Sequence, residues 1–270
     1  MTSTETVSNA GAERIAAAFT DNGKRAALMP YLMGGFPTIE GSLAIGHAYA
    51  DGGADLVELG IPFSDPLADG PVVAAAGAAA LRAGTTVAGV LTVCEGLAPR
   101  FPVVLMCYAN QVLVHGAEAF AARLRDAGAS GLIVPDLPME EAPAVLAACD
   151  AAGLALVPLV APTTPDERLR AIGSRARGFL YTVSVTGTTG ERHAPLGEQV
   201  AAVVGRAKTC TDVPVALGFG ITSPEQASEA ADAGADGVIV GSRLVREAAE
   251  AKDPAKAVRT VVAALADGLR

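Results

Sequence analysis

The stretch DLVELGIPFSDPLADGP occupies residues 55–71 and changes character at Gly60. Up to Gly60 it is largely apolar, as a buried strand is. After Gly60 it contains three prolines, which neither a regular helix nor a central strand accommodates. The alanine-rich run at 72–82 then has the composition of a helix. The sequence therefore predicts a strand, a stiff loop and a helix in succession.

Acidic side chains punctuate this stretch. Glu58 interrupts the apolar strand near its C-terminal end, whereas Asp65 and Asp69 lie in the loop. Burying an unpartnered carboxylate costs on the order of several kcal/mol or forces it to hold a proton, so Glu58 is expected to face water or a cavity. Asp65 before Pro66 and Asp69 before Gly70 are also ordinary turn signals. The spacing alone therefore fits a catalytic pair and structural acids about equally well.

The overall composition is that of a globular protein. With 270 residues, 51% hydrophobic and 18% charged, the chain fits one barrel-type domain or two small domains. The net charge of −9 argues against a nucleic acid or an anionic membrane as partner, because both require a basic face. The four cysteines are far apart and there are three histidines, so we expect no metal site and a reducing compartment.

The chain start and the hydropathy point to a cytoplasmic protein. Residues 1–12 are polar and acidic, and lack the basic start and apolar centre of a signal peptide. No apolar run approaches the ~18 residues that a membrane span requires. We therefore expect a soluble, cytoplasmic protein that does not bind a membrane.

Eight short, apolar and often β-branched strands alternate with helices along the chain. They are expected to start near 27, 55, 102, 131, 154, 179, 213 and 237. Such strands are typical of a parallel sheet that is buried on both faces. The turn motif Gly-Ala-Asp or Gly-Ala-Ser recurs at 53–55, 128–130 and 234–236, before the second, fourth and eighth strands. Eight βα units favour a single (β/α)8 TIM barrel, with a doubly wound open sheet as the alternative.

No linker divides the chain. We expect a flexible N-terminus over 1–10 and one TIM-barrel catalytic domain over 11–270, with a short extra N-terminal helix at 13–19. Two capping boxes, each with proline at the first helical position, are predicted at 164–167 and 223–226.

Glycine-rich loops follow the last three predicted strands. They lie at 185–190, 218–221 and 241–242. Glycine lets the backbone approach a ligand closely, and a helix start offers unpaired N–H groups to an anion. TIM barrels usually bind phosphate after strands seven and eight. The three loops together therefore predict a phosphate site.

The stretch ELGIPFSDPLADGP at residues 58–71 closely resembles the signature of the tryptophan synthase alpha chain family, and the resemblance continues along most of the chain. It implies a lyase of tryptophan biosynthesis that splits indole-3-glycerol phosphate into indole and D-glyceraldehyde 3-phosphate by a retro-aldol reaction. Glu58 then fits the acid–base group, because desolvation raises the pKa of a carboxyl group. Asp69 fits an ionised carboxylate that accepts the indole N–H bond.

The other expected substrate-binding residues fall into two groups. In the glycine-rich loops they are Thr189, Gly190, Phe219, Gly220, Ile221, Gly241 and Ser242, and the resemblance implies that Gly190, Gly220, Gly241 and Ser242 bind the phosphate. In the apolar wall, on or at the ends of predicted strands, they are Tyr31, Met106, Tyr108, Ile133 and Tyr181. Each of these is by residue type more often a core residue, but Tyr108 and Tyr181 match pocket aromatics of the family. His115 and His193 are expected to do no chemistry.

A partner is implied as well. Members of the family work with a pyridoxal-phosphate beta chain in an alpha2-beta2 complex, so no cofactor is expected in this chain itself. The residues expected at the partner interface are Pro62, Phe63, Asp65, Pro66 and Asp136. The sequence departs modestly from the family pattern at 34–37, at Pro135 and in the loop 185–193, none of which includes the two proposed catalytic acids.

Two other functions stay open at this point. The first is another phosphate-binding barrel enzyme, such as an isomerase or a flavin mononucleotide oxidoreductase, which the stretch 58–71 disfavours. The second is a non-catalytic subunit that only activates a partner. Loss of Glu58 or Asp69 would have favoured that reading, and both residues are present.

Overall fold

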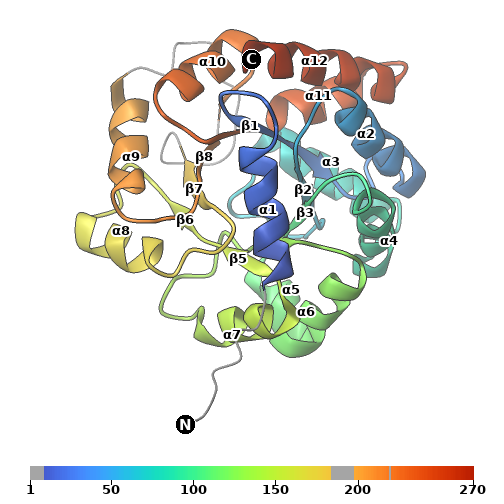
Figure 1. Ribbon diagram of the computed structural model, residues 1–270. Helices are drawn as coiled ribbons and strands as arrows, with labels where there is room; N and C mark the ends of the chain where they lie inside the picture. Colours follow the sequence, from blue (N-terminus) through green and yellow to red (C-terminus); the bar gives the residue numbers. More distant parts are fainter. Residues whose placement is uncertain (1–8, 184–197, 219) are drawn as a thin grey trace.

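Parallel strands pair side by side into a barrel that helices surround (Figure 1). The computed structural model describes residues 9–183, 198–218 and 220–270. In these residues the strands are β1 (Ala27–Met33), β2 (Val57–Gly60), β3 (Val103–Met106), β4 (Gly131–Ile133), β5 (Ala155–Val157), β6 (Leu159–Val160), β7 (Leu180–Val183), β8 (Val215–Gly218) and β9 (Gly237–Val240).

The barrel closes where one continuous stretch of chain joins the two end strands of the sheet, β5 and β6. The strand order is β5-β4-β3-β2-β1-β9-β8-β7-β6, and β5 and β6 are separated only by Pro158. They are the two halves of the strand predicted from residue 154, divided at a proline that has no N–H to donate. Each half pairs with one neighbour, β5 with β4 and β6 with β7. The predicted TIM barrel of eight βα units is confirmed.

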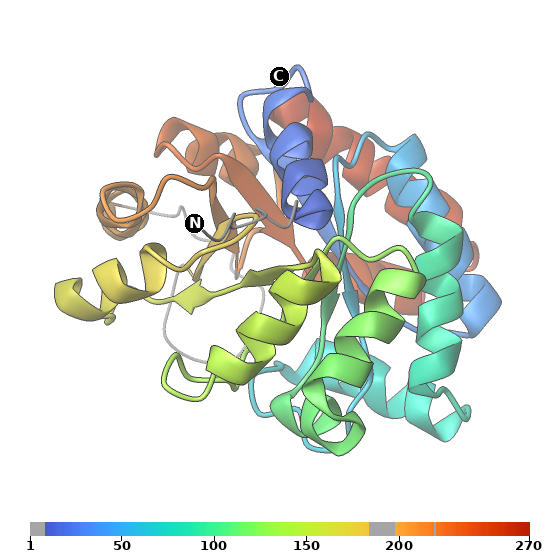
Figure 2. The same ribbon diagram turned by 60° about the horizontal axis from the view of Figure 1, so that its bottom comes forward.

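Helices cover the outside of the strands, as the view in Figure 2 also shows. They are α1 (Ala10–Thr20), α2 (Ile39–Asp51), α3 (Pro71–Arg82), α4 (Val87–Leu97), α5 (Ala109–His115), α6 (Ala117–Asp126), α7 (Pro143–Ala152), α8 (Asp166–Gly173), α9 (Glu198–Lys208), α10 (Pro224–Asp232), α11 (Ser242–Glu250) and α12 (Pro254–Gly268). The short helix α5 is absent from the sequence-based expectation, whereas the extra N-terminal helix is present as α1.

Helix α1 closes one end of the barrel (Figure 1). Its Ile15 is fully buried and packs, with Phe19, against the side chains that fill the barrel interior. Asn9 caps the helix by accepting a hydrogen bond from the backbone N–H of Ala12. The expectation of a flexible N-terminus falls mainly on residues 1–8, which lie outside the described residues.

The strand period of two separates the inside of the barrel from its outer layer. Around β2, Leu56 belongs to the cluster inside the barrel, while Val57 and Leu59 belong to the cluster between strands and helices. Glu58 alternates with Val57 and Leu59 and therefore points inward. The residue that interrupts the apolar strand thus faces the interior, near the C-terminal end of β2.

Side-chain caps define several helix starts, though one predicted cap is not formed. Ser223 accepts a hydrogen bond from the N–H of Gln226 at the start of α10, as expected. Thr164 does not cap α8; its Oγ1 instead accepts a hydrogen bond from Ala161, inside the loop before the helix. The capping box predicted at 164–167 is therefore wrong.

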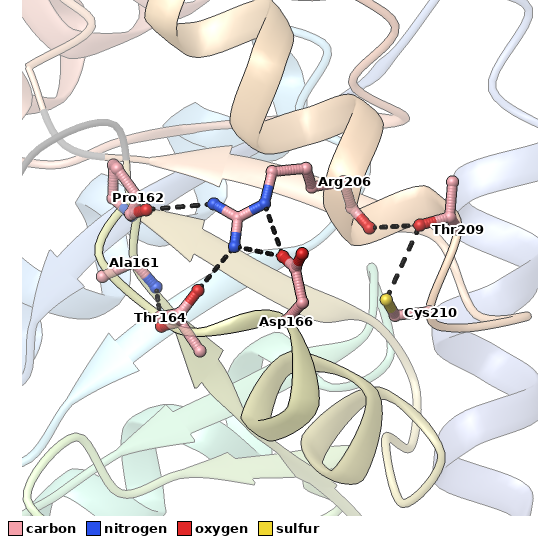
Figure 3. A network of polar contacts seen from close by, with 7 residues as sticks. All are labelled: Ala161, Pro162, Thr164, Asp166, Arg206, Thr209 and Cys210. Carbon is pink, nitrogen blue, oxygen red and sulfur yellow. Dashed lines mark hydrogen bonds and ion pairs between the residues drawn. The ribbon is translucent and has the colours of Figure 1, made fainter.

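The loop before α8 is held from the neighbouring helix instead (Figure 3). Arg206 of α9 donates to the carbonyl oxygens of Pro162 and Thr164 and to Oδ1 of Asp166. One guanidinium group thus binds three acceptors along this loop, an arrangement that suits the fork of arginine donors.

Within the described residues, no single helix is both long and apolar enough to span a membrane. Helices α3 and α4, which meet at a sharp bend, reach that length and apolar composition only as a pair.

Candidate active site

A cavity opens at the C-terminal ends of the strands, where TIM barrels carry their catalytic groups. The predicted catalytic acids Glu58 and Asp69 both line it. So do eight of the predicted substrate-binding residues, namely Tyr31, Met106, Ile133, Tyr181, Gly220, Ile221, Gly241 and Ser242. Strands β1, β2, β3, β4, β6, β7 and β9, the loops that follow β2, β4 and β8, and helices α3 and α11 thus all contribute residues to one cavity.

Glu58 is 2% exposed and stands in register with Tyr31 on the neighbouring strand β1. Desolvation by burial, and secondly the charge of Asp69, raise the pKa of Glu58 from 4.5 to about 8. Burial disfavours the charged form of a carboxyl group, and a second carboxylate nearby adds to that effect. Glu58 therefore holds a proton near neutral pH.

Asp69 lies in the acidic loop between β2 and α3. Its backbone N–H donates to the carbonyl of Pro66, and its side-chain Oδ1 is buried without a hydrogen-bond partner in the described structure. Burial raises the pKa of Asp69 to about 6, and a hydrogen bond from Tyr108 opposes the rise. Asp69 is therefore mostly ionised at neutral pH and leaves one carboxylate oxygen for a donor on a ligand.

Tyr108 holds the acidic loop in place through a hydrogen bond and a ring contact. Its hydroxyl accepts a hydrogen bond of 3.1 Å from the backbone N–H of Ala68, and its ring stacks on Phe63 with the ring centroids 5.3 Å apart. The predicted substrate residue Tyr108 is 2% exposed and is not one of the residues that line the cavity. Its contacts support the position of Asp69.

The other end of the cavity carries backbone groups suited to an anion. Gly220 has a φ of +91°, a conformation that side chains disfavour. Gly241 and Ser242 stand at the start of α11, where backbone N–H groups lack intrahelical partners. Gly220, Gly241 and Ser242 thus line the cavity together, and their binding of phosphate stays a prediction. Thr189, Gly190 and Phe219, predicted with them, lie outside the described residues.

Sequence reasoning missed several residues of the cavity. These are Ala68, Val73, Pro135, Leu159, Ile239 and Arg243. The apolar ones carry no local signal that separates a cavity wall from a core. Arg243 directly follows Ser242, and its position next to the predicted phosphate site was a signal that could have identified it.

The residues predicted for a partner interface are placed unevenly. Pro62 is buried, Phe63 is half-buried against Tyr108, and Asp65 is exposed. Oδ1 of Asp136 accepts a hydrogen bond of 2.8 Å from the backbone N–H of Ala109. Asp136 thus caps the start of α5, a helix in another βα unit.

Within 9–183, 198–218 and 220–270, no group of three or more histidine, cysteine or acidic side chains is arranged to hold a metal ion. The cavity places two carboxyl groups with different raised pKa values close to backbone N–H groups at a helix start. The fold and the cavity therefore define the class: a TIM-barrel protein whose cavity holds two carboxyl groups of raised pKa.

Comparisons with known proteins identify the family. A sequence model of the family described as "Tryptophan synthase alpha chain" matches residues 17–269. The tryptophan synthase alpha chain of Prochlorococcus marinus is 48% identical over 229 residues, covering 84% of this chain and 83% of its own. That of Methanosarcina mazei is 45% identical over 246 residues, covering 91% and 90%. A chain in a structure of Mycobacterium tuberculosis tryptophan synthase matches with a TM-score of 0.88 and 40% identity, covering 95% of this chain and 98% of that one.

The chain belongs to the tryptophan synthase alpha chain family. This family cleaves indole-3-glycerol phosphate to indole and glyceraldehyde 3-phosphate in tryptophan biosynthesis, and the chain is accordingly a lyase of the aldolase type. The resemblance stated from the stretch at 58–71 is confirmed.

Proposed function

We propose that Glu58 and Asp69 carry out the carbon–carbon cleavage of indole-3-glycerol phosphate in this chain. The observation that carries the proposal is the pair itself. Two carboxyl groups line one cavity, with the pKa of Glu58 raised to about 8 and that of Asp69 to about 6. Near neutral pH Glu58 holds a proton and Asp69 is ionised, and the proposed reaction needs one carboxyl group in each of these two states.

The proposed steps conserve protons. Glu58 donates its proton to the indole ring carbon that bears the side chain, and the ring becomes positively charged. The Glu58 carboxylate then takes the proton of the side-chain hydroxyl as the carbon–carbon bond breaks, which gives indole and the aldehyde. Oδ1 of Asp69, which has no partner in the described structure, accepts a hydrogen bond from the ring N–H and so stabilises the positive charge on the ring.

The anion-binding end orients the substrate. We place the phosphate group against the backbone of Gly220, Gly241 and Ser242, which line the cavity together with the two acids. The indole ring then lies between the aromatic and aliphatic side chains of Tyr31, Met106 and Tyr181. Because these steps use only proton transfers, the mechanism requires no cofactor in this chain.

The direct test is release of indole from indole-3-glycerol phosphate by the purified protein. Glu58→Gln and Asp69→Asn are each expected to reduce turnover at least ~10²-fold with little change in substrate affinity, because each removes an interaction made in the transition state. Normal turnover in either variant would rule out the role given to that residue. A wild-type protein that releases no indole, alone or with a beta chain, would overturn the proposed function.

We further propose that the chain docks a pyridoxal-phosphate beta chain, in a complex of two alpha and two beta chains, through an apolar patch at the rim of the barrel. We assign three exposed large apolar side chains of the described residues to this patch: Leu67 is 80%, Leu113 67% and Val114 74% exposed. Gln111 of α5 donates a hydrogen bond to the carbonyl of Pro62, so the acidic loop and α5 are joined. Exposed apolar residues beside acids are typical of an interaction site.

This patch sharpens the interface expected from the sequence. Phe63 is a poor probe of docking, because its removal also removes the stacking on Tyr108. Leu113→Ser and Leu67→Ser are expected to weaken co-purification with the beta chain while the isolated chain keeps its basal rate. Leu81→Ser on α3, which is 36% exposed, serves as the matched control. Undiminished binding by both patch variants would place the interface elsewhere.

We propose a cytoplasmic location for the chain. The four cysteines are free, and Cys94, Cys107 and Cys149 are buried. Free thiols fit a reducing compartment. Fractionation of the native cells, with enzyme activity as the readout, tests this location.

A further inference from the structure

The cavity combines two acidic side chains with a proposed phosphate site. Among its described lining residues, Arg243 is the single cationic one, whereas Glu58 and Asp69 are both carboxyl groups. A phosphate dianion that enters beside an ionised Asp69 meets like charge in a partly desolvated space, which is unfavourable. Helix starts and backbone N–H groups offset such charge only with partial positive charges. A positively charged side chain beside the phosphate would offset the remaining negative charge.

Arg243 is the second residue of α11 and follows Ser242 directly. Its guanidinium Nη1 forms an ion pair with Oε2 of Glu247, one helical turn further along. The side chain of Arg243 is 26% exposed and that of Glu247 28%, so the pair lies partly screened at the edge of the site. The guanidinium is thus directed along the helix, toward Glu247.

The two possible partners of this guanidinium differ in charge and in geometry. Phosphate carries more negative charge than a carboxylate and presents several acceptor oxygens to the arginine fork. An ion pair between residues four apart on a helix contributes little to stability, because both side chains lose freedom when they pair. The Glu247 contact is therefore weak enough for a bound phosphate to replace it.

We propose that Arg243 binds the phosphate group of the substrate and that Glu247 is its competing counter-ion. Arg243 exchanges Glu247 for phosphate by a side-chain rotation, and returns to Glu247 when the product leaves. Glu247 thereby lowers phosphate affinity slightly and keeps the cation neutralised in the empty site. The identity of the phosphate compound rests on the proposed function, whereas the binding of phosphate by Arg243 does not.

The test measures binding without the reaction. Inorganic phosphate, glycerol 3-phosphate and indole are titrated by calorimetry into the full chain and its variants. Arg243→Ala is expected to weaken both phosphate compounds by about tenfold to a hundredfold, because a charge-assisted hydrogen bond is lost, and to leave indole affinity unchanged. Glu247→Gln is expected to tighten them by about twofold. Arg243→Lys keeps the charge without the fork and is expected to fall between wild type and Arg243→Ala.

Two controls keep the result specific. Lys252→Ala removes one positive charge at an exposed position just after α11, so it reports any general effect of net charge and is expected to change nothing. The double variant of Arg243→Ala with Glu247→Gln is expected to behave as Arg243→Ala alone, because Glu247 acts only through the arginine. Circular dichroism confirms that each variant is folded.

Unchanged phosphate affinity in Arg243→Ala, or an equal loss in Lys252→Ala, would overturn the role of Arg243. Unchanged affinity in Glu247→Gln would overturn the role of Glu247. These outcomes are separable from a failure of the proposed function. If the wild-type chain releases no indole but Arg243→Ala still weakens phosphate binding, the proposed reaction is contradicted and the role of Arg243 is supported. If the wild-type chain releases indole normally but Arg243→Ala binds phosphate as well as wild type does, the proposed reaction is supported and the role of Arg243 is contradicted.

Discussion

The hydroxyl oxygen of Tyr31 occupies space that Gly60 leaves open: a Cβ atom added at Gly60 would lie 2.1 Å from it. Gly60 thus ends the apolar strand and also leaves room for a neighbouring side chain. Its missing side chain lets the phenol of β1 lie across the C-terminal end of β2, beside Glu58. The same arrangement recurs across the barrel, where a Cβ at Gly218 would lie 2.5 Å from the hydroxyl of Tyr181. Two glycines therefore set the position of two tyrosines in the cavity wall.

Gly60→Ala is expected to lower both turnover and the free energy of unfolding, because the ring of Tyr31 must move within a packed interior. Tyr31→Ala removes the obstacle. The double-mutant cycle should therefore show a favourable coupling of about 1–3 kcal/mol between the two changes, measured by urea unfolding. A strictly additive cycle would contradict the steric account.

Gly205 of α9 is the matched control. A Cβ added there meets no atom within 4 Å. Gly205→Ala is therefore expected to leave activity unchanged and to stabilise the chain by up to about 1 kcal/mol, as alanine does in a helix interior.

Activity should depend on pH through the carboxyl pair. The proposed mechanism requires Glu58 protonated, with a pKa of about 8, and Asp69 ionised, with a pKa of about 6. A plot of kcat/KM against pH is expected to be bell-shaped, with its limbs near these two values, which belong to the pair as a unit. Asp69→Asn removes a cause of the raised Glu58 pKa, so in the residual activity the alkaline limb should move to lower pH. An unchanged alkaline limb would argue against Glu58 as the group that titrates there.

Stability should depend on pH through Glu58. The folded chain holds this proton up to about pH 8, whereas the unfolded chain releases it near the ordinary value of 4.5. Between these values the folded state binds more protons, so the contribution of Glu58 to stability is present at low pH and is lost as pH rises toward 8, by at most about 1.4 kcal/mol per pH unit. Glu58→Gln cannot ionise. Its free energy of unfolding relative to wild type should increase from pH 5 to pH 8 in urea titrations; a constant difference would show that Glu58 ionises in the folded chain as it does in the unfolded one.

Phosphate binding should be sensitive to charge at Gly220. Gly220→Asp adds a carboxylate where the anion is proposed to bind and is expected to raise the KM for indole-3-glycerol phosphate at least ~10-fold, with free indole affinity little changed. Because the φ of Gly220 is +91°, any side chain also strains the backbone there. Gly220→Ala measures that strain alone, and the charge effect is the difference between the two variants. Equal effects of aspartate and alanine would place the phosphate elsewhere.

Much of this site was accessible from the sequence because its signals are local. Glu58 breaks an apolar strand, and a strand period of two then decides that it points inside the barrel. Gly241 and Ser242 sit between a strand and a helix, where chain order alone gives the position. Proline and glycine mark the acidic loop. Each of these features is fixed by neighbours within a few residues.

The features that escaped prediction depend on contacts between distant residues. Helix α5 begins where Asp136, 27 residues further along the chain, accepts the N–H of Ala109. The loop at Thr164 is held by Arg206, 42 residues away, so its own capping signal has no effect. Tertiary contacts override local preference in each case.

The repeated Gly-Ala-Asp turn has a structural counterpart at the entrances of β2 and β9. Asp55 accepts the N–H of Leu28 on one oxygen and binds Lys24 with the other, and Lys24 also donates to the carbonyl of Gly53. Asp236 repeats the pattern with Val215 and Lys208, and Lys208 donates to Gly234. In the third copy a serine replaces the aspartate: Ser130 Oγ is buried and has no hydrogen-bond partner in the described structure, and Arg14 donates to the carbonyl of Gly128.

Three alanine substitutions at this equivalent position should therefore have three outcomes. Asp55→Ala leaves Lys24 without its carboxylate partner at a place where both side chains are about 10% exposed or less. This substitution should lower the free energy of unfolding by about 3–5 kcal/mol. Asp236→Ala breaks a pair that is 43% and 35% exposed, so the loss should be nearer about 1–2 kcal/mol, most of it from the backbone hydrogen bond. Ser130→Ala removes a hydroxyl group that is already unsatisfied and should be neutral or slightly stabilising. Urea unfolding of the three variants checks this order. If Ser130→Ala proves as damaging as Asp55→Ala, the serine has a partner in solution, and the three turns share a polar requirement that their hydrogen bonds do not explain.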